Sequence, residues 1–144
     1  MTLSVEHLDR RCDTLEQALL AIEQHPESTH GVLFDLYRNA AIKSFELSLE
    51  TAGKLLRKAL KAFEASPRTV DAWVFNDVLR HAGKHGVMTS AEVERWLAYR
   101  ANRNSTAHDY GAGFANDTLQ LLPAYLHDVR NLALALQKVF DASA

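Results

Sequence analysis

The sequence predicts an all-α protein, built as an up-and-down antiparallel bundle of four to five helices. Three prolines and six glycines interrupt its 144 residues, and the long stretches between them are rich in alanine, leucine, glutamate, lysine and arginine. These five residue types favour helix. Apolar residues also recur at intervals of three and four, which places them on one face of a helix. The length is typical of one domain, so residues 1–144 are expected to form a single helical domain.

The first two predicted helices lie on either side of Pro26. Within residues 8–22 the apolar positions step by four, three, four and three, which predicts a helix with one apolar stripe. A second helix, the longest predicted element, covers about residues 32–64 and is ended by Pro67. Apolar residues occupy more than one side of this helix. We therefore expect it to be central in the fold or to be shared with a second subunit.

Three further helices are predicted after Pro67. The third covers about residues 69–82, with Val74 among its inward-facing residues, and it ends at the glycine-containing segment that follows. Thr89 and Glu92 have the spacing of a capping box, which introduces a fourth helix, and the polar run 102–116 ends it. The last helix, over about residues 119–140, has an apolar seam suited to an antiparallel bundle. Pro123 is expected to kink it near its start.

The composition limits the kinds of protein that this chain can be. No 18-residue stretch is free of charge, which excludes a membrane protein. The N-terminus lacks the basic and apolar segments of a secretory signal, and Cys12 has no second cysteine to pair with. We therefore expect a cytoplasmic protein with a buried, inert Cys12. The net charge of −2 provides no general attraction for nucleic acid, so an RNA contact requires a local basic patch.

The stretch 103–110 combines side chains that suit phosphate chemistry. Arg103 offers a planar fork of donors that matches a phosphodiester. His108 can exchange a proton near neutral pH, and the 2′-hydroxyl of RNA supplies a nucleophile that needs no metal. The spacing of these residues also fits a purely structural role. In that alternative, Arg103 and His108 cap the last carbonyls of the fourth helix, and Tyr110 anchors the following loop by packing.

Two motifs resemble those of a known family. Arg103, His108 and Tyr110 form the string RxxxxHxY, with Asn104 directly after the arginine. Residues 45–50, followed by a lysine and a leucine at 54–55, resemble the FExxxE...K pattern of a long second helix. Together they resemble the HEPN superfamily of prokaryotic helical-bundle proteins, in its branch of nucleotidyltransferase substrate-binding proteins. The resemblance covers nearly the whole chain but departs at Gly53, where many relatives carry tryptophan, so packing or a partner contact is expected to differ there.

The resemblance implies a homodimer in which the motifs of two subunits meet at the interface. It also implies a cognate partner, a minimal nucleotidyltransferase (MNT), in a toxin and antitoxin pair whose toxin is the bundle protein. Such toxins are similar to metal-independent endoribonucleases. On this resemblance, Arg103 would hold the scissile phosphate, His108 would act as general acid or base, and Asn104 would orient the motif. Tyr110 would receive AMP from the partner, which would inactivate the toxin.

Two functions from different classes fit this motif. The first is a toxic endoribonuclease that acts on RNA and is neutralised by the MNT partner. The second is a non-catalytic binding subunit that presents a substrate, or its own Tyr110, to the nucleotidyltransferase. The sequence has no phosphate-binding glycine loop, no Gly-x-Ser-x-Gly elbow and no CxxC pair, which argues against the usual NTPases, serine hydrolases and zinc ribbons. We expect no cofactor.

Two acidic residues of the second helix are candidates for a supporting role. Glu46 and Glu50 share a helix face with Lys54, so Glu50 and Lys54 can form a helix-stabilising pair. In the functional alternative, Glu46 or Glu50 projects toward Arg103 or His108 and orients it.

Basic residues form two groups that are candidate RNA contacts. The RNA-contact candidates are Arg95 and Arg100 beside the motif and Lys54 on the second helix. The lysine begins a basic stripe at helical spacing that also contains Arg57, Lys58 and Lys61, and a solvated helix surface is the simpler explanation of this stripe.

His81 and His85 are four residues apart, a spacing that can bind a metal from one helix face. Only these two ligands are evident, and the neighbouring glycines indicate a helix end, where histidine faces the negative end of the helix dipole. We therefore predict no metal site.

Trp73 and Trp96 are expected to be core aromatics.

Overall fold

The computed structural model describes residues 4–64, 66–106 and 112–143, and every regular element in these ranges is a helix. The helices are α1 (Glu6–Gln24), α2 (Gly31–Leu60), α3 (Pro67–Ala72), α4 (Phe75–Lys84), α5 (Ser90–Thr106) and α6 (Ala112–Ser143). None of the helices in the described ranges has the length and apolar character that crossing a membrane requires.

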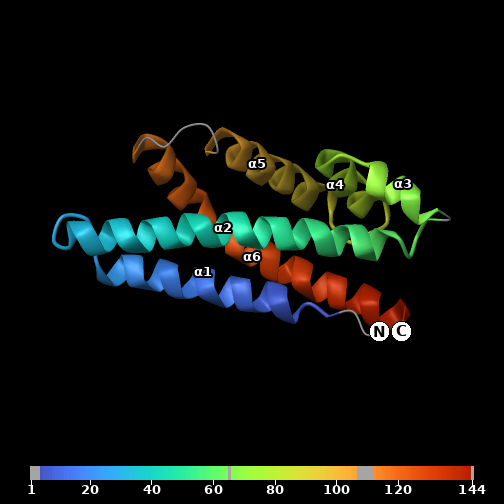
Figure 1. Ribbon diagram of the computed structural model, residues 1–144, viewed down its shortest axis with the longest axis horizontal. Coiled ribbons are helices and arrows are strands. Elements are labelled where there is room, and N and C mark those ends of the chain that lie inside the picture. Colours follow the sequence, from blue (N-terminus) through green and yellow to red (C-terminus); the bar gives the residue numbers. More distant parts are fainter. Residues whose placement is uncertain (1–3, 65, 107–111, 144) are drawn as a thin grey trace.

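Four long helices make up the body of the molecule (Figure 1). α1 and α2 run side by side in opposite directions, and α6 packs against both of them. α5 runs back in the direction opposite to α2 and contacts α6. The short helices α3 and α4 are inserted between α2 and α5, and α4 packs on both. The predicted all-α, up-and-down bundle is confirmed, with two short helices added to four long ones.

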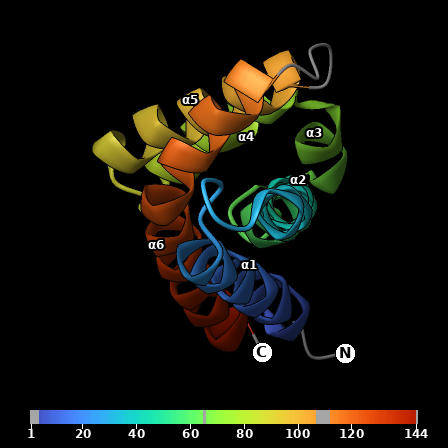
Figure 2. The ribbon, with the colours of Figure 1, turned by 90° about the vertical axis from the view of Figure 1, so that its left-hand side faces the viewer.

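Helix α6 changes direction along its length. Figure 2 shows its orange first part lying at a steep angle to its red remainder. Pro123 lies inside this helix. Because proline removes a backbone hydrogen bond and its ring clashes with the preceding turn, sharp kinks in helices concentrate at such residues. The bend agrees with the kink expected from the sequence.

The core is closed by large aromatic side chains from α2, α5 and α6. Phe45, Trp96 and Tyr125 are fully buried. The rings of Phe45 and Tyr125 meet edge to face, with centroids 4.7 Å apart. The hydroxyl groups of Ser48 and Tyr125 are hydrogen-bonded at 2.6 Å, so neither is left unsatisfied in the core. Cys12 is also buried, as predicted, and burial raises the pKa of its thiol to about 11.

The predicted third helix is wrong in its extent. Residues 67–84 form two helices, α3 and α4, because Trp73 and Val74 adopt extended backbone with ψ of 140° and 160°. The run of tryptophan, valine and phenylalanine that follows Ala72 has low helix propensity, since branched and aromatic side chains lose rotamer freedom in a helix. Val74, expected to face inward, is 65% exposed. Trp96 is a core residue as predicted, whereas Trp73 is only partly buried.

The second half of the chain is more helical than its composition indicates. α6 has 32 residues and α2 has 30, so α2 is not the longest element. The polar run 102–116 is also not a loop throughout, because α5 continues to Thr106 and α6 begins at Ala112.

The predicted capping box at the start of α5 is present. The backbone N–H of Thr89 donates to Glu92 at 2.9 Å, and that of Glu92 donates to the Thr89 hydroxyl at 3.1 Å.

Candidate active site

A pocket of about 430 Å³ lies against the middle of α2, where the start of α4 and the last turns of α5 approach it. Five of its side chains are basic and two are acidic. This excess of positive charge suits an anion such as a phosphodiester. The lining residues are Lys43, Glu46, Leu47, Leu49, Glu50, Gly53, Lys54, Arg57, Phe75, Arg100, Arg103 and Asn104.

Arg103 faces Glu46 across this pocket. Nη2 of Arg103 is 3.9 Å from Oε2 of Glu46, and Nζ of Lys43 lies at the same distance from that oxygen. At this separation the contacts are ion pairs and not direct hydrogen bonds. The Arg103 and Glu46 side chains are 32% and 23% exposed, so water screens their attraction only in part. The structure therefore brings Glu46, and not Glu50, to the arginine of the motif.

Arg100 is held over an aromatic ring. Its guanidinium carbon lies 4.9 Å from the centroid of the Phe75 ring, which is a cation–π contact. The ring in turn lies against the backbone of Gly53, where an added Cβ would come within 2.6 Å of Cε2 of Phe75. Gly53 thus leaves the space in which Phe75 forms the pocket wall. A tryptophan, which the family resemblance leads us to expect at this position, cannot be accommodated here unless Phe75 moves.

The basic stripe of α2 is mostly engaged in other contacts. Nζ of Lys54 is 3.3 Å from Oε1 of Glu50, and both side chains are exposed. This is the helix-stabilising pair that the spacing predicts, worth about 0.2–0.5 kcal/mol. Arg57 donates a hydrogen bond of 3.0 Å to the carbonyl oxygen of Val70, and Lys61 pairs with a carboxylate of α3 at 2.9 Å. Part of the stripe therefore attaches α3 to α2.

Arg95 lies away from the pocket and is bound by Asp128 of α6. Its Nε and Nη2 donate to the two carboxylate oxygens at 2.8 and 3.0 Å, and the hydroxyl of Tyr99 donates to the same carboxylate at 2.5 Å. Burial raises the pKa of Asp128, but these hydrogen bonds outweigh burial and hold the pKa below its ordinary value. Since Arg95 precedes Arg100 by five residues, it is turned by about 140° around α5. The two arginines that the sequence groups together thus face different sides.

The remaining motif residues come directly after Arg103 in the sequence. Asn104 lines the pocket beside Arg103, whereas His108 and Tyr110 lie outside the described residues. The described part of the pocket can bind an anionic group between Arg100 and Arg103. The described residues that line it include no imidazole. Among the described residues, the one group of three side chains that could hold a metal lies between the segment after α2 and the C-terminal end of α4.

Sequence reasoning missed two residues that line the pocket, Phe75 and Lys43, and one that binds Arg95 away from it, Asp128. Phe75 belongs to an apolar run and resembles an ordinary core residue, and Lys43 precedes the FExxxE pattern. Asp128 carries a detectable signal, because it is a carboxylate beside the apolar positions of the last helix, where a buried charge requires a partner. Its partners, Arg95 and Tyr99, are about 30 residues away and cannot be identified by spacing.

Known proteins resemble this chain over most of its length. The family model described as nucleotidyltransferase substrate binding protein like matches residues 10–138. A Haemophilus influenzae protein named probable ribonuclease HepT is 28% identical over 110 residues, which cover 75% of this chain and 74% of that protein.

Two solved structures share the fold. One, from Haemophilus influenzae and described as a substrate binding domain of a nucleotidyltransferase, has a TM-score of 0.81 at 24% identity, covering 93% of this chain and 99% of the other. A second, from Thermus thermophilus, has a TM-score of 0.61 at 25% identity, covering 85% of this chain and 98% of the other. The resemblance inferred from the sequence is confirmed, and the chain belongs to the family of nucleotidyltransferase substrate-binding proteins.

Proposed function

We propose that this protein is the toxin of a HEPN and MNT toxin–antitoxin pair, a cytoplasmic endoribonuclease that cleaves RNA without a metal. The observation that carries the proposal is the positive pocket in which Arg103, paired with Glu46, lies beside Arg100. The match to a protein named as a probable ribonuclease supports it.

In the proposed reaction the nucleophile belongs to the RNA. The 2′-oxygen attacks the phosphorus, the bond from phosphorus to the 5′-oxygen breaks, and a cyclic phosphate and a 5′-hydroxyl result. The 2′-hydroxyl loses a proton and the departing 5′-oxygen gains one. His108 carries out one of these two transfers, as general base or general acid, and water carries out the other. Arg103 and Arg100 stabilise the negative charge that builds up on the phosphoryl oxygens. Asn104 orients the motif, and Glu46 restrains Arg103 through their ion pair.

RNA cleavage by purified protein tests this proposal. His108→Ala should slow cleavage by about 10²- to 10⁴-fold, the usual loss when a proton-transfer group is removed. Arg103→Lys should also be strongly impaired, since an ammonium group cannot reproduce a two-pronged phosphate contact. EDTA should leave the rate unchanged. The matched control is His127→Ala, which removes an exposed histidine of α6 and should cleave normally. Cleavage that stops in EDTA but survives His108→Ala would overturn the mechanism.

We propose that the partner nucleotidyltransferase inactivates this protein by adenylylation of Tyr110. The phenolic oxygen would attack the α-phosphorus of ATP and release pyrophosphate. The new phosphodiester would place an anion next to Arg103 and block the pocket. Incubation with the partner, ATP and magnesium should raise the intact mass by one or more AMP units. Tyr110→Phe should take up none and stay toxic, and AMP on any other residue would contradict the assignment.

The second candidate function is that of a non-catalytic subunit that binds substrate for the nucleotidyltransferase. The family description and the description of the Haemophilus influenzae structure favour it. In that case the purified protein would leave RNA intact, and His108→Ala would be as harmless to growth as the unchanged protein. Expression of the chain alone and together with its partner, with cell growth and RNA integrity as readouts, separates the two functions.

We also propose a homodimer with the motif region at or beside the interface. Three apolar side chains near the start of α2, Val32, Leu33 and Leu36, are exposed in the single chain, which supports burial by a second copy. Light scattering at micromolar concentration should give twice the mass of the chain. A monomer of full activity would contradict a shared active site.

A further inference from the structure

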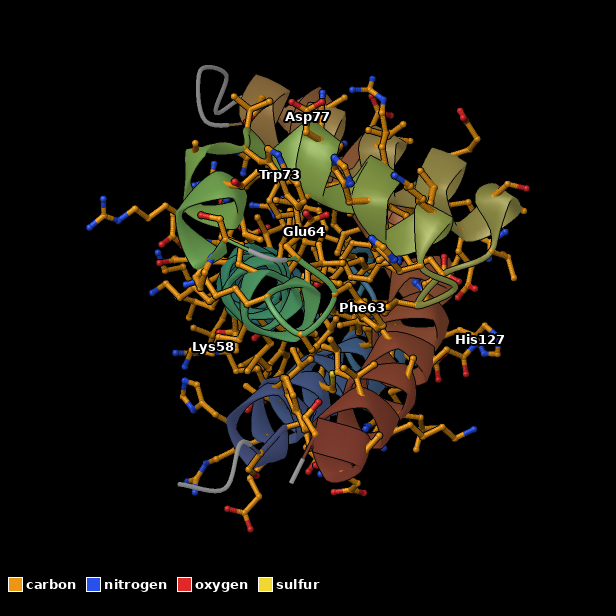
Figure 3. The ribbon with its side chains drawn as sticks, turned by 90° about the vertical axis from the view of Figure 1, so that its right-hand side faces the viewer. Lys58, Phe63, Glu64, Trp73, Asp77 and His127 are labelled. Carbon is orange, nitrogen blue, oxygen red and sulfur yellow. The ribbon has the colours of Figure 1, made fainter. Side chains whose placement is uncertain are left out.

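A second polar cluster lies where the segment after α2 meets the end of α4. It consists of Glu64, His81 and His85, whose potential ligand atoms all lie within 4.8 Å of one another. Glu64 is 17 residues before the first histidine, so spacing does not reveal it as a third ligand. Figure 3 shows Glu64 at this end of the molecule, between the end of α2 and α4.

Both imidazoles have a buried nitrogen without a hydrogen-bond partner among the described residues. These atoms are Nδ1 of His81 and Nε2 of His85. Nε2 of His85 is 3.8 Å from Oε1 of Glu64, which is too long for a hydrogen bond. Buried polar atoms are nearly always satisfied, because an unmade hydrogen bond is costly in the interior. Two such nitrogens next to the Glu64 carboxylate make up a set of donor atoms that a metal ion could bind.

The two imidazole rings are held in fixed orientations by aromatic neighbours. His81 stacks on Trp73 with centroids 3.7 Å apart and an angle of 3° between the planes. His85 stacks on Phe63 at 4.7 Å and 9°. The ring planes are thus set before any ligand binds, which lowers the entropy lost on binding. Figure 3 shows Phe63 and Trp73 on the same end of the molecule as Glu64.

We propose that Glu64, His81 and His85 bind one divalent transition-metal ion, of which Zn²⁺ suits the ligands best. Two histidines and one glutamate form a known type of zinc site with a fourth position open to water. With bonds of about 2.0–2.1 Å, a tetrahedral ion holds its ligand atoms about 3.3 Å apart. The three side chains would therefore close by about 1.5 Å or less from their present separation, which rotation about side-chain bonds can provide.

The ion would join two segments that are distant in sequence. Glu64 follows α2, whereas His81 lies in the last turn of α4 and His85 caps that helix. Phe75, at the other end of α4, lines the candidate active site about 15 Å along the helix axis from His85. The proposed ion would fasten α4 to the end of α2, and at this distance it would not reach a phosphodiester bound in the candidate active site.

Titration of the untagged, chelator-treated protein with ZnCl₂ tests the proposal. Calorimetry should find one tight site per chain, and saturating Zn²⁺ should raise the unfolding temperature. Glu64→Gln keeps the size of the side chain and both aromatic stacks, and it should weaken Zn²⁺ binding by at least about 10- to 100-fold, since even residues that only orient a ligand have effects of this size. His85→Gln should have the same effect.

Two controls separate this site from other histidines. His127→Gln changes an exposed histidine of α6 that lies away from the cluster in Figure 3, and it should bind Zn²⁺ as the unchanged protein does. His30→Gln should do the same, although the rings of His25 and His30 lie 5.2 Å apart. Equal binding by the unchanged protein and by Glu64→Gln, or no binding at all, would overturn the proposal. A stabilising effect of Zn²⁺ that persists in Glu64→Gln would do so as well.

Discussion

The close contact between Gly53 and Phe75 predicts how the protein will respond to a larger side chain at residue 53. Substituting Gly53→Ala adds one methyl group to a buried face of α2. That methyl carbon would lie 2.6 Å from Cε2 and 3.2 Å from Cδ2 of the Phe75 ring, whereas ordinary contacts are 3.4–4 Å. The ring must move by roughly 1 Å, and overpacking of this kind costs about 1–3 kcal/mol.

Helix propensity opposes this cost. Alanine is favoured over glycine by about 1 kcal/mol within a helix. Gly53→Ala should therefore lower the free energy of unfolding by about 0–2 kcal/mol, although the same change at an uncrowded helical site would raise it. If Phe75 is first replaced by alanine, the crowding disappears, and Gly53→Ala should then stabilise the protein by about 1 kcal/mol. Gly53→Ala is thus expected to destabilise the protein when Phe75 is present and to stabilise it when Phe75 is replaced by alanine.

Urea unfolding of the four proteins of this double-mutant cycle, at one fixed concentration, measures the effect. The expected coupling energy between the two positions is about 1–3 kcal/mol. Gly31→Ala is the matched control, since no atom lies within 4 Å of a Cβ added there. Gly53→Ala should also displace the ring beneath Arg100 and slow the proposed RNA cleavage. Equal stabilisation by Gly53→Ala with and without Phe75 would refute the reasoning.

The surroundings of Cys12, Asp128 and Glu46 each lead to a further prediction. Because burial raises the pKa of Cys12 to about 11, this thiol should not react with a thiol reagent at pH 8 until urea unfolds the chain. The folded-state pKa of Asp128 is below its ordinary value, so its stabilising effect is present above about pH 4 and is lost as the pH falls through the folded pKa. The free energy of unfolding should therefore fall more steeply below about pH 4 in the unchanged protein than in Asp128→Asn. If the free energy of unfolding depends on pH in the same way in both proteins, Arg95 does not stabilise the carboxylate. Glu46→Gln removes the ion pair with Arg103 and should slow the proposed RNA cleavage roughly 10-fold, as loss of an orienting carboxylate does. The free energy of unfolding should change by less than about 1 kcal/mol. Unchanged cleavage would assign Glu46 to the helix surface alone.

The candidate site could be predicted in part because its motif residues are close in sequence. Arg100, Arg103 and Asn104 reach the pocket from one stretch of α5, and Glu46 could be named because the family pattern marks it. Phe75 could not be named, since its role depends on the missing side chain at residue 53. Arg95 does not join Arg100 at the pocket, because residues five apart on a helix face different sides and Arg95 is bound by Asp128.

The fold class, the four long helices and the capping box follow from the sequence alone, because periodicity, propensity and capping are properties of neighbouring residues. Which distant side chains meet depends instead on tertiary packing. Packing places Glu46 at Arg103, Asp128 at Arg95, and Glu64 beside the two histidines of α4. It also places the ring of Trp73, at the break between α3 and α4, against the imidazole of His81. These pairings depend on shape and burial over the whole chain, which no local pattern records.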